Sequence, residues 1–124
     1  MKILLDTHIL IWFLEDNKKL NDKLLELIVN PINLIYFSSV SMAEMALKAS
    51  KNKLIYPDDI LNICYEQGFE ELALLSKHSL VLRDLPLVHN DPFDRLLVAQ
   101  ALSEDIFLMS ADQIFIQYNI KLIK

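Results

Sequence analysis

Residues 2–15, KILLDTHILIWFLE, contain the pattern that decides the fold. Lys2–Leu5 is short and mostly apolar, which predicts a buried strand, and His8–Glu15 follows as a predicted helix. The two are separated by a turn that contains Asp6. A buried strand followed directly by a helix is the first unit of an α/β fold.

The alternation of strands and helices continues along the chain and predicts one α/β domain over residues 1–124. Further strands are predicted at Leu34–Ser38, Glu71–Leu74, Ile106–Met109 and Lys121–Ile123. Further helices are predicted from Asn21 as N-cap to about Asn30, at Ser41–Lys51, from Pro57 to about Gly68, after Ser76, at Pro92–Glu104 with Asp91 as N-cap, and at Ala111–Tyr118. Asp84–Asn90 is predicted to be a loop. We therefore expect a Rossmann-like parallel sheet of about five strands with helices on both faces.

The composition excludes several kinds of site and location. Gly68 is the only glycine, so no glycine-rich phosphate loop is present, and the single Cys64 excludes an internal disulfide and a cysteine-based zinc site. The apolar stretch Ile3–Leu14 is interrupted by Asp6 and His8, which makes it too short and too polar for a membrane span or an export signal. These features favour a cytoplasmic location.

Two acidic residues lie directly after predicted parallel strands. Asp6 follows the first strand and Asp112 follows the fourth. Ligands of such sheets bind beyond the carboxyl ends of the strands, so we expect both carboxylates at one crevice if the two strands are neighbours. Glu44 and Asp94 lie on predicted helices among apolar residues, which places them at the border of the core.

Each of these acids also has a purely structural interpretation. Asp6 could cap a helix, Asp94 and Asp112 could favour the positive ends of helix dipoles, and Glu44 could pair with Lys48 one turn on. However, carboxylates at the border of a core are costly as bare ions and persist when a cation compensates them. Four of them suggest one shared cation, and oxygen ligands select Mg²⁺ or Mn²⁺ over zinc.

The remaining polar residues carry weaker signals. The three histidines His8, His78 and His89 share no ligand spacing and are interpreted as bystanders. Ser110 either orients the acids or caps a helix. The net charge of −5 is unfavourable for a nucleic-acid-binding protein, so RNA phosphates would need local cations, for which the candidates are Lys48, Lys51, Lys53 and Arg95. A solvated surface explains the lysines equally well.

Four segments together resemble the successive blocks of a PIN domain, most closely the VapC-like toxins of prokaryotic toxin–antitoxin pairs. They are LLDTHILIWFL at 4–14, SSVSMAEMALK at 38–48, NDPFDRLLVAQA at 90–101 and LMSAD at 108–112. The third block is specific, and the resemblance covers almost the whole chain in the right order.

The resemblance implies a Mg²⁺-dependent endoribonuclease whose catalytic and metal-binding residues are Asp6, Glu44, Asp94 and Asp112. It also implies an RNA substrate, a cognate antitoxin protein and a homodimer. Ile11–Leu14 cannot all face inward on so short a helix, so a groove beside that helix and the ones near Asn21–Asn30 and Ser41–Lys51 is the expected antitoxin site.

The chain departs from the family pattern without losing an acid. Ala43 stands where the family often has tryptophan, Asn52-Lys53 where Gly-Lys is common, and Ser110 where threonine is more usual. The alternative is a non-catalytic PIN-like module that binds RNA or protein. A receiver-like signalling domain is disfavoured because Thr7 follows Asp6, and a phosphatase of the DxD type is disfavoured because His8 stands in place of the second acid.

Overall fold

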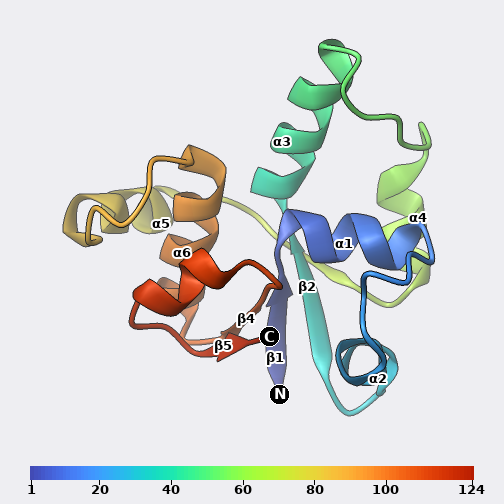
Figure 1. Cartoon of the computed structure of the whole chain (residues 1–124), viewed down its shortest axis with the longest axis horizontal. Helices are drawn as coiled ribbons and strands as arrows, with labels where there is room; N and C mark the ends of the chain where they lie inside the picture. Colours follow the sequence, from blue (N-terminus) through green and yellow to red (C-terminus); the bar gives the residue numbers. More distant parts are fainter.

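Strands and helices alternate along the chain in the computed structural model, which describes residues 1–124 (Figure 1). The strands are β1 (Lys2–Leu5), β2 (Leu34–Ser38), β3 (Glu70–Leu72), β4 (Phe107–Met109) and β5 (Leu122–Ile123). The α-helices are α1 (Thr7–Leu14), α2 (Asp22–Val29), α3 (Ser39–Ser50), α4 (Ile60–Glu66), α5 (Ser76–Val81) and α6 (Pro92–Glu104). Two 3₁₀ helices, η1 (Leu82–Asp84) and η2 (Gln113–Gln117), complete the set.

The five strands form one parallel sheet in the order β3-β2-β1-β4-β5. The central strand β1 pairs on one side with β2, where Ile3 lies opposite Ile35, and on the other side with β4, where Ile3 lies opposite Phe107. The predicted fold class is therefore confirmed. The first and fourth strands are neighbours, which was the condition for Asp6 and Asp112 to share one crevice.

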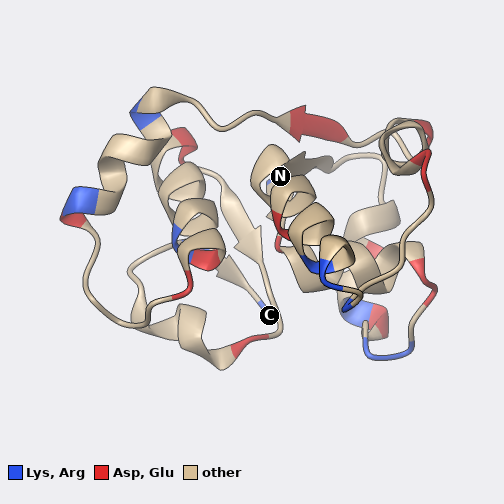
Figure 2. Ribbon diagram, turned by 90° about the horizontal axis from the view of Figure 1, so that it is seen from above, with Lys and Arg blue, Asp and Glu red and all other residues tan.

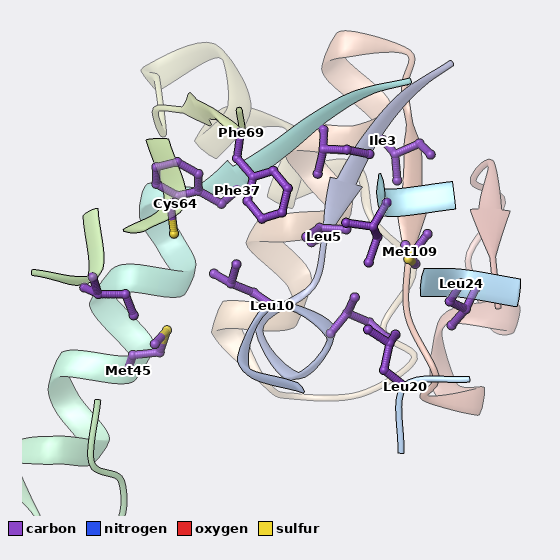
Figure 3. Packing of buried hydrophobic residues seen from close by; sticks show 14 residues of the cluster. Ile3, Leu5, Leu10, Leu20, Leu24, Phe37, Met45, Cys64, Phe69 and Met109 are labelled. Atoms are coloured by element: carbon purple, nitrogen blue, oxygen red, sulfur yellow. The ribbon is translucent and has the colours of Figure 1, made fainter. Parts of the chain in front are cut away.

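The two faces of the sheet bury two separate apolar clusters. Because side chains alternate along a strand, Ile3 and Leu5 point to one face and Leu4 to the other. The first cluster lies under α1, α2 and α4, and its side chains interlock around Leu5 and Phe37 (Figure 3). The second lies under α6 and contains Leu97 and other residues of that helix. Helices cover both faces, as predicted.

Three helices begin with the side-chain caps that the sequence predicts. The carboxylate of Asp6 accepts from the N–H of Ile9 at 2.8 Å, and the amide oxygen of Asn21 accepts from the N–H of Leu24 at 2.9 Å. Asp91 likewise caps α6 by accepting from the N–H groups at 93 and 94. A cap satisfies N–H groups that have no partner within the helix, which defines the first residue of each helix.

Three predicted helix starts or types are wrong. Helix α4 begins at Ile60 and not at Pro57, because the N–H of Ile60 bonds to the Pro57 carbonyl at 3.1 Å and closes a turn first. Ser76 is the first residue of α5, and Leu75 holds the cap position. The predicted helix over 111–118 is a 3₁₀ helix, with Phe115 bonded back to the Asp112 carbonyl.

The other differences are shifts of one or two residues at element ends. Helix α3 begins at Ser39, two residues earlier than predicted, because the Ser38 hydroxyl caps it by accepting from the N–H of Val40. The last three strands are each one residue shorter than predicted, and β3 begins one residue earlier. Gly68 ends the α4 region with a φ of +83°, a conformation that glycine adopts without strain. No helix has both the length and the apolar character that a membrane span requires.

Candidate functional site

The predicted acidic residues reach the same end of the sheet from four different elements. Asp6 and Asp112 follow β1 and β4, whose parallel alignment brings their carboxyl ends together. Glu44 lies on α3, which begins at the end of β2, and Asp94 lies in the first turn of α6. The order of the strands therefore places these residues near one edge of the sheet.

Asp6 is the most deeply buried of the four acids, with 3% of its surface exposed. Its backbone N–H donates to the carbonyl of Met109 at 3.0 Å, which fixes Asp6 to the end of β4. Burial raises the pKa of Asp6 to about 6, and the negative charge of Asp94 contributes to the rise. Hydrogen bonds from the Ser110 hydroxyl and the N–H of Ile9 oppose it. Asp6 is thus both a helix cap and a carboxylate whose charged form is disfavoured.

Glu44 is also buried, with 4% of its surface exposed. Its Oε2 accepts from the ammonium of Lys48 at 2.9 Å, which is the pairing that the structural interpretation predicted. Its Oε1 is buried and has no hydrogen-bond partner. Buried polar atoms almost always have a partner, so this oxygen is the unexplained feature of the site.

Asp94 is less buried, with 20% of its side chain exposed. Burial is the largest cause that raises its pKa, and the charges of Asp91 and Glu44 add to the rise. A hydrogen bond between Asp94 Oδ2 and Nε2 of His89, at 3.2 Å, opposes it. The Asp94 carboxylate is therefore close to other negative groups and is held by one hydrogen-bond contact, with His89.

Asp112 is joined to Asp6 through Ser110. The Asp112 carboxylate accepts from the N–H of Ile114 at 3.0 Å and so caps η2, while its own N–H donates to the buried Ser110 hydroxyl at 3.0 Å. Asp6, His8, Trp12 and Asp112 line one hollow of about 220 Å³. Ser110 therefore contacts the backbone of Asp112 and lowers the pKa of Asp6, and its role in orienting the acids stays a prediction.

The four acids are close in pairs and do not form a tight cluster. Asp94 affects the pKa of Asp6, and Glu44 affects that of Asp94, while Asp112 shares the hollow with Asp6. No three histidine, cysteine or acidic side chains are grouped so that they could hold one metal ion. The chemistry of the donors nevertheless fits Mg²⁺, since all are carboxylate oxygens and one buried oxygen, Glu44 Oε1, lacks a partner. The metal stays a prediction.

Arg95 and His89 make contacts that the sequence analysis did not predict. The guanidinium Nη1 of Arg95 donates to the carbonyls of Pro86 and His89 and to the hydroxyl of Tyr118, so this nitrogen organises the loop before α6. His89, predicted to be a bystander, contacts Asp94 directly. Only proximity in sequence to Asp94 hinted at this contact, because Tyr118, which binds the other ring nitrogen, lies 29 residues away.

Comparison with known proteins gives one family match. The family model described as PIN domain matches residues 3–121. No curated protein sequence shows a significant match to the chain.

Several solved structures share the fold of this chain at low sequence identity. A chain in the crystal structure of VapBC2 from Rickettsia felis, bound to a DNA fragment from their promoter, is 20% identical with a TM-score of 0.75, and the alignment covers 99% of this chain and 98% of that one. A chain in DNA-bound VapBC from Salmonella typhimurium is 14% identical with a TM-score of 0.68, and the alignment covers 99% of this chain and 97% of that one. A chain in FitAcB from Neisseria gonorrhoeae is 18% identical with a TM-score of 0.66, and the alignment covers 98% of this chain and 96% of that one. These likenesses show the fold.

Proposed function

The chain belongs to the PIN domain family, and from this membership we propose that it is a Mg²⁺-dependent endoribonuclease and the toxin of a toxin–antitoxin pair. The observation that carries the proposal is the buried Oε1 of Glu44, which has no partner on an edge that also carries Asp6 and Asp94. A cation bound at this edge would be the missing partner of that oxygen and would relieve the repulsion among the carboxylates.

Asp6, Glu44 and Asp94 are the residues that would hold Mg²⁺, with Asp112 completing the site or holding a second ion. When bound, the metal makes a coordinated water more acidic and stabilises charge on the phosphate oxygens. The chain itself supplies position. Asp6 is fixed by the N–H of Ile9, and the Ser110 hydroxyl, which lowers the pKa of Asp6, accepts from the backbone N–H of Asp112.

The test of the activity uses purified protein and total cellular RNA. We expect wild type to cut RNA in Mg²⁺ and not in EDTA, and we expect Asp6→Asn and Glu44→Gln to lose cleavage while keeping the fold by circular dichroism. Asp22→Asn, which changes an exposed acid in the first turn of α2, is the matched control and should cleave normally. Full activity in either site variant would refute the assignment, and mapping the cleaved ends identifies the RNA target.

We propose that an antitoxin binds this chain, because solved structures with the same fold include VapBC and FitAB, and we place its binding site beside α1. Two hollows flank this helix. One, of about 210 Å³, lies toward α3 and α4 and is lined mainly by apolar residues, among them Ile11, Leu14 and Ile55, which is 94% exposed. The other lies toward α2 and includes Trp12 and Phe13. An amphipathic segment of the antitoxin could cover these side chains.

The toxin role is tested in cells. Expression of the chain alone should slow growth, and co-expression of the small gene next to it should restore growth. A chain that is harmless at high soluble levels would contradict the toxin role. It would leave the nuclease assignment to be decided by the RNA assay.

A homodimer is the expected assembly. The segment from β3 to α6 exposes large apolar side chains, including Leu75, Leu80 and Leu87, the last of which is 92% exposed. Large apolar side chains that remain exposed can mark a protein contact. Analytical ultracentrifugation of wild type and of Leu80→Glu is the direct test, with a dimer expected for the first and a monomer for the second.

A non-catalytic PIN-like module that binds RNA or protein is the second candidate. The observation that favours it is the absence of any three grouped metal-ligand side chains. RNA binding without cleavage in Mg²⁺ and in Mn²⁺ would establish it in place of the nuclease.

A further inference from the structure

We propose that His89 is a positioning residue that orients the carboxylate of Asp94 for metal binding, and that Tyr118 and Arg95 set its hydrogen-bonding state. The inference rests on the proposed function, because it assigns a purpose to Asp94 as a metal ligand. It concerns a side chain that lies five residues before Asp94 and contacts it directly, with 3.2 Å between His89 Nε2 and Asp94 Oδ2.

The imidazole of His89 is held in place from several sides. It lies in the loop between η1 and α6, and 18% of its side chain is exposed. Its ring packs edge-on against the rings of Phe115 and Tyr118, with centroids 6.2 and 5.6 Å away. The loop itself is fixed by Arg95, which donates to the Pro86 carbonyl at 2.8 Å. The contact with Asp94 is therefore made by a constrained ring.

The hydrogen bonds of this group run in one direction. Arg95 can only donate, and its Nη1 donates to the Tyr118 hydroxyl at 3.1 Å. We assign the hydroxyl proton to the contact with Nδ1 of His89, which is 2.8 Å long. A neutral imidazole that accepts at Nδ1 carries its proton at Nε2, which donates to Oδ2 of Asp94. The series thus ends with a donor aimed at one carboxylate oxygen.

This arrangement leaves the two oxygens of Asp94 in different states. Oδ2 is engaged by His89, whereas no protein group donates to Oδ1. Partners of metal ligands fix ligand orientation and strengthen metal binding, and their removal usually weakens binding or activity about 10- to 100-fold. Asp94 already has such a hydrogen-bond partner, which is His89.

The other end of α6 offers a matched comparison. There, Nδ1 of His78 accepts from the N–H of Leu75, and Nε2 contacts Oε2 of Glu104 at 2.9 Å. This pair has the same chemistry on the same helix, but Glu104 also pairs with Lys77 and is not one of the acidic-site residues. Its role is to join α5 to α6. A change at His78 therefore tests the removal of a histidine–carboxylate bond away from the acidic site.

The experiment measures Mn²⁺ affinity by calorimetry, with folding checked by circular dichroism. His89→Phe should weaken Mn²⁺ binding by about 10- to 100-fold, while His89→Gln, whose amide nitrogen stands near the position of Nε2, should retain most of the affinity. Tyr118→Phe keeps the ring and removes only the hydroxyl, so it should bind more weakly than wild type even if His89→Phe does not fold. The control His78→Phe removes the equivalent bond to Glu104 and should bind Mn²⁺ as wild type does.

Two further readouts separate positioning from a general structural effect. Nitrogen-15 spectra of labelled histidine should show the Nε2–H form at His89 in wild type and a shift toward the other form in Tyr118→Phe. In RNA cleavage, kcat should fall with little change in KM. Unchanged Mn²⁺ affinity in both His89→Phe and Tyr118→Phe, with wild type binding normally, would overturn the positioning role alone. A wild type that neither binds Mn²⁺ nor cuts RNA would overturn the proposed function and this inference with it.

Discussion

At the scale of single residues, structural and functional interpretations of an acid are not exclusive. Asp6 caps α1 and has a raised pKa, and Glu44 pairs with Lys48 and still leaves a buried oxygen without a partner. The reason is geometric. In a parallel sheet the turn after a strand is both the start of a helix and the edge where ligands bind, so one carboxylate can serve both.

Asp94 provides a stability test of the site that needs no RNA. Its pKa is raised by burial and by nearby acids, so its charged form destabilises the fold. Asp94→Asn keeps an acceptor for His89 and removes the charge. In EDTA at pH 7 we expect the variant to melt at a higher temperature than wild type. The expected gain in the free energy of unfolding is on the order of 1 kcal/mol. Mg²⁺ should raise the melting temperature of wild type and should have less effect on the variant.

The control for this comparison is Asp22→Asn. Asp22 also lies in the first turn of a helix, and it is exposed. A carboxylate there interacts favourably with the helix dipole, so this control should be slightly less stable than wild type. If Asp94→Asn behaves in the same way and Mg²⁺ shifts neither protein, Asp94 serves only the helix.

At the scale of elements, helix α6 is held at both ends by histidine–carboxylate contacts. His89 contacts Asp94 in the first turn, and His78 contacts Glu104 in the last. In the middle, the side chain of Gln100 accepts from the hydroxyl of Ser38 and donates to the carbonyl of Leu72 at 3.2 Å. These contacts fix the angle of α6 against the sheet, and with it the position of Asp94.

The contact at the end of α6 predicts a pH-dependent contribution to stability. Hydrogen bonds from Lys77 and His78 lower the pKa of Glu104 below its ordinary value. A lowered carboxyl pKa stabilises the fold above the pKa of the unfolded chain, and the contribution disappears as the pH falls through the folded value. Glu104→Gln should therefore be less stable than wild type at pH 7, by less than about 1 kcal/mol because the pair is partly exposed.

Thermal melts from pH 7 down to acid conditions measure this effect. The difference between Glu104→Gln and wild type should shrink as the pH falls. Glu26→Gln, at an exposed glutamate in the middle of α2 that has no ion pair, should show no comparable change. A constant difference at every pH would mean that the amide changes packing and that charge has no part in it.

Local sequence patterns predicted most elements but not all of their starts. Asn21 and Asp91 had strong capping chemistry, and the helices after them begin where expected. Pro57 was expected to open a helix, but Asp58 and Asp59 continue the turn, and Asp59 makes no side-chain cap bond. Where a capping side chain is present, the local sequence determines the first residue of the helix. Where none is present, the first residue depends on packing against the rest of the molecule.

At the scale of the whole molecule, the sequence predicted the parallel sheet and the identity of the acids at its edge. It could not predict the arrangement around Asp94, because the contact between His89 and Tyr118 joins a loop before α6 to the end of η2. Such contacts depend on the packing of distant segments and leave no periodic pattern in the chain. The same applies to the bonds that Arg95 Nη1 makes to the Pro86 carbonyl and the Tyr118 hydroxyl, which no local pattern indicated.

The distribution of charge over the molecule limits how the proposed RNA substrate can bind. The net charge is −5, and lysines and arginines are dispersed over the ribbon instead of forming one stripe (Figure 2). Helix α3 begins at the carboxyl edge of the sheet and extends away from it (Figure 1), with Lys51 and Lys53 exposed at its far end. Lys48 is engaged by Glu44. We therefore expect RNA that lies across the acidic edge to contact the end of α3.

The last prediction follows from counterion release, which makes the affinity for RNA fall with salt in proportion to the number of phosphates bound. The double change Lys51→Glu and Lys53→Glu should weaken binding of a labelled RNA, measured by fluorescence anisotropy in EDTA between about 50 and 200 mM salt. It should also flatten the logarithmic slope by about 0.7 for each phosphate of single-stranded RNA that the variant no longer neutralises. Lys2→Glu reverses an equally exposed charge at the opposite, amino end of β1 and should leave the slope unchanged. If the double variant keeps the wild-type slope, RNA does not pass over α3. If Lys2→Glu, which makes half the change in charge, flattens the slope by about half as much as the double variant does, the effect belongs to the net charge of the molecule and to no particular surface.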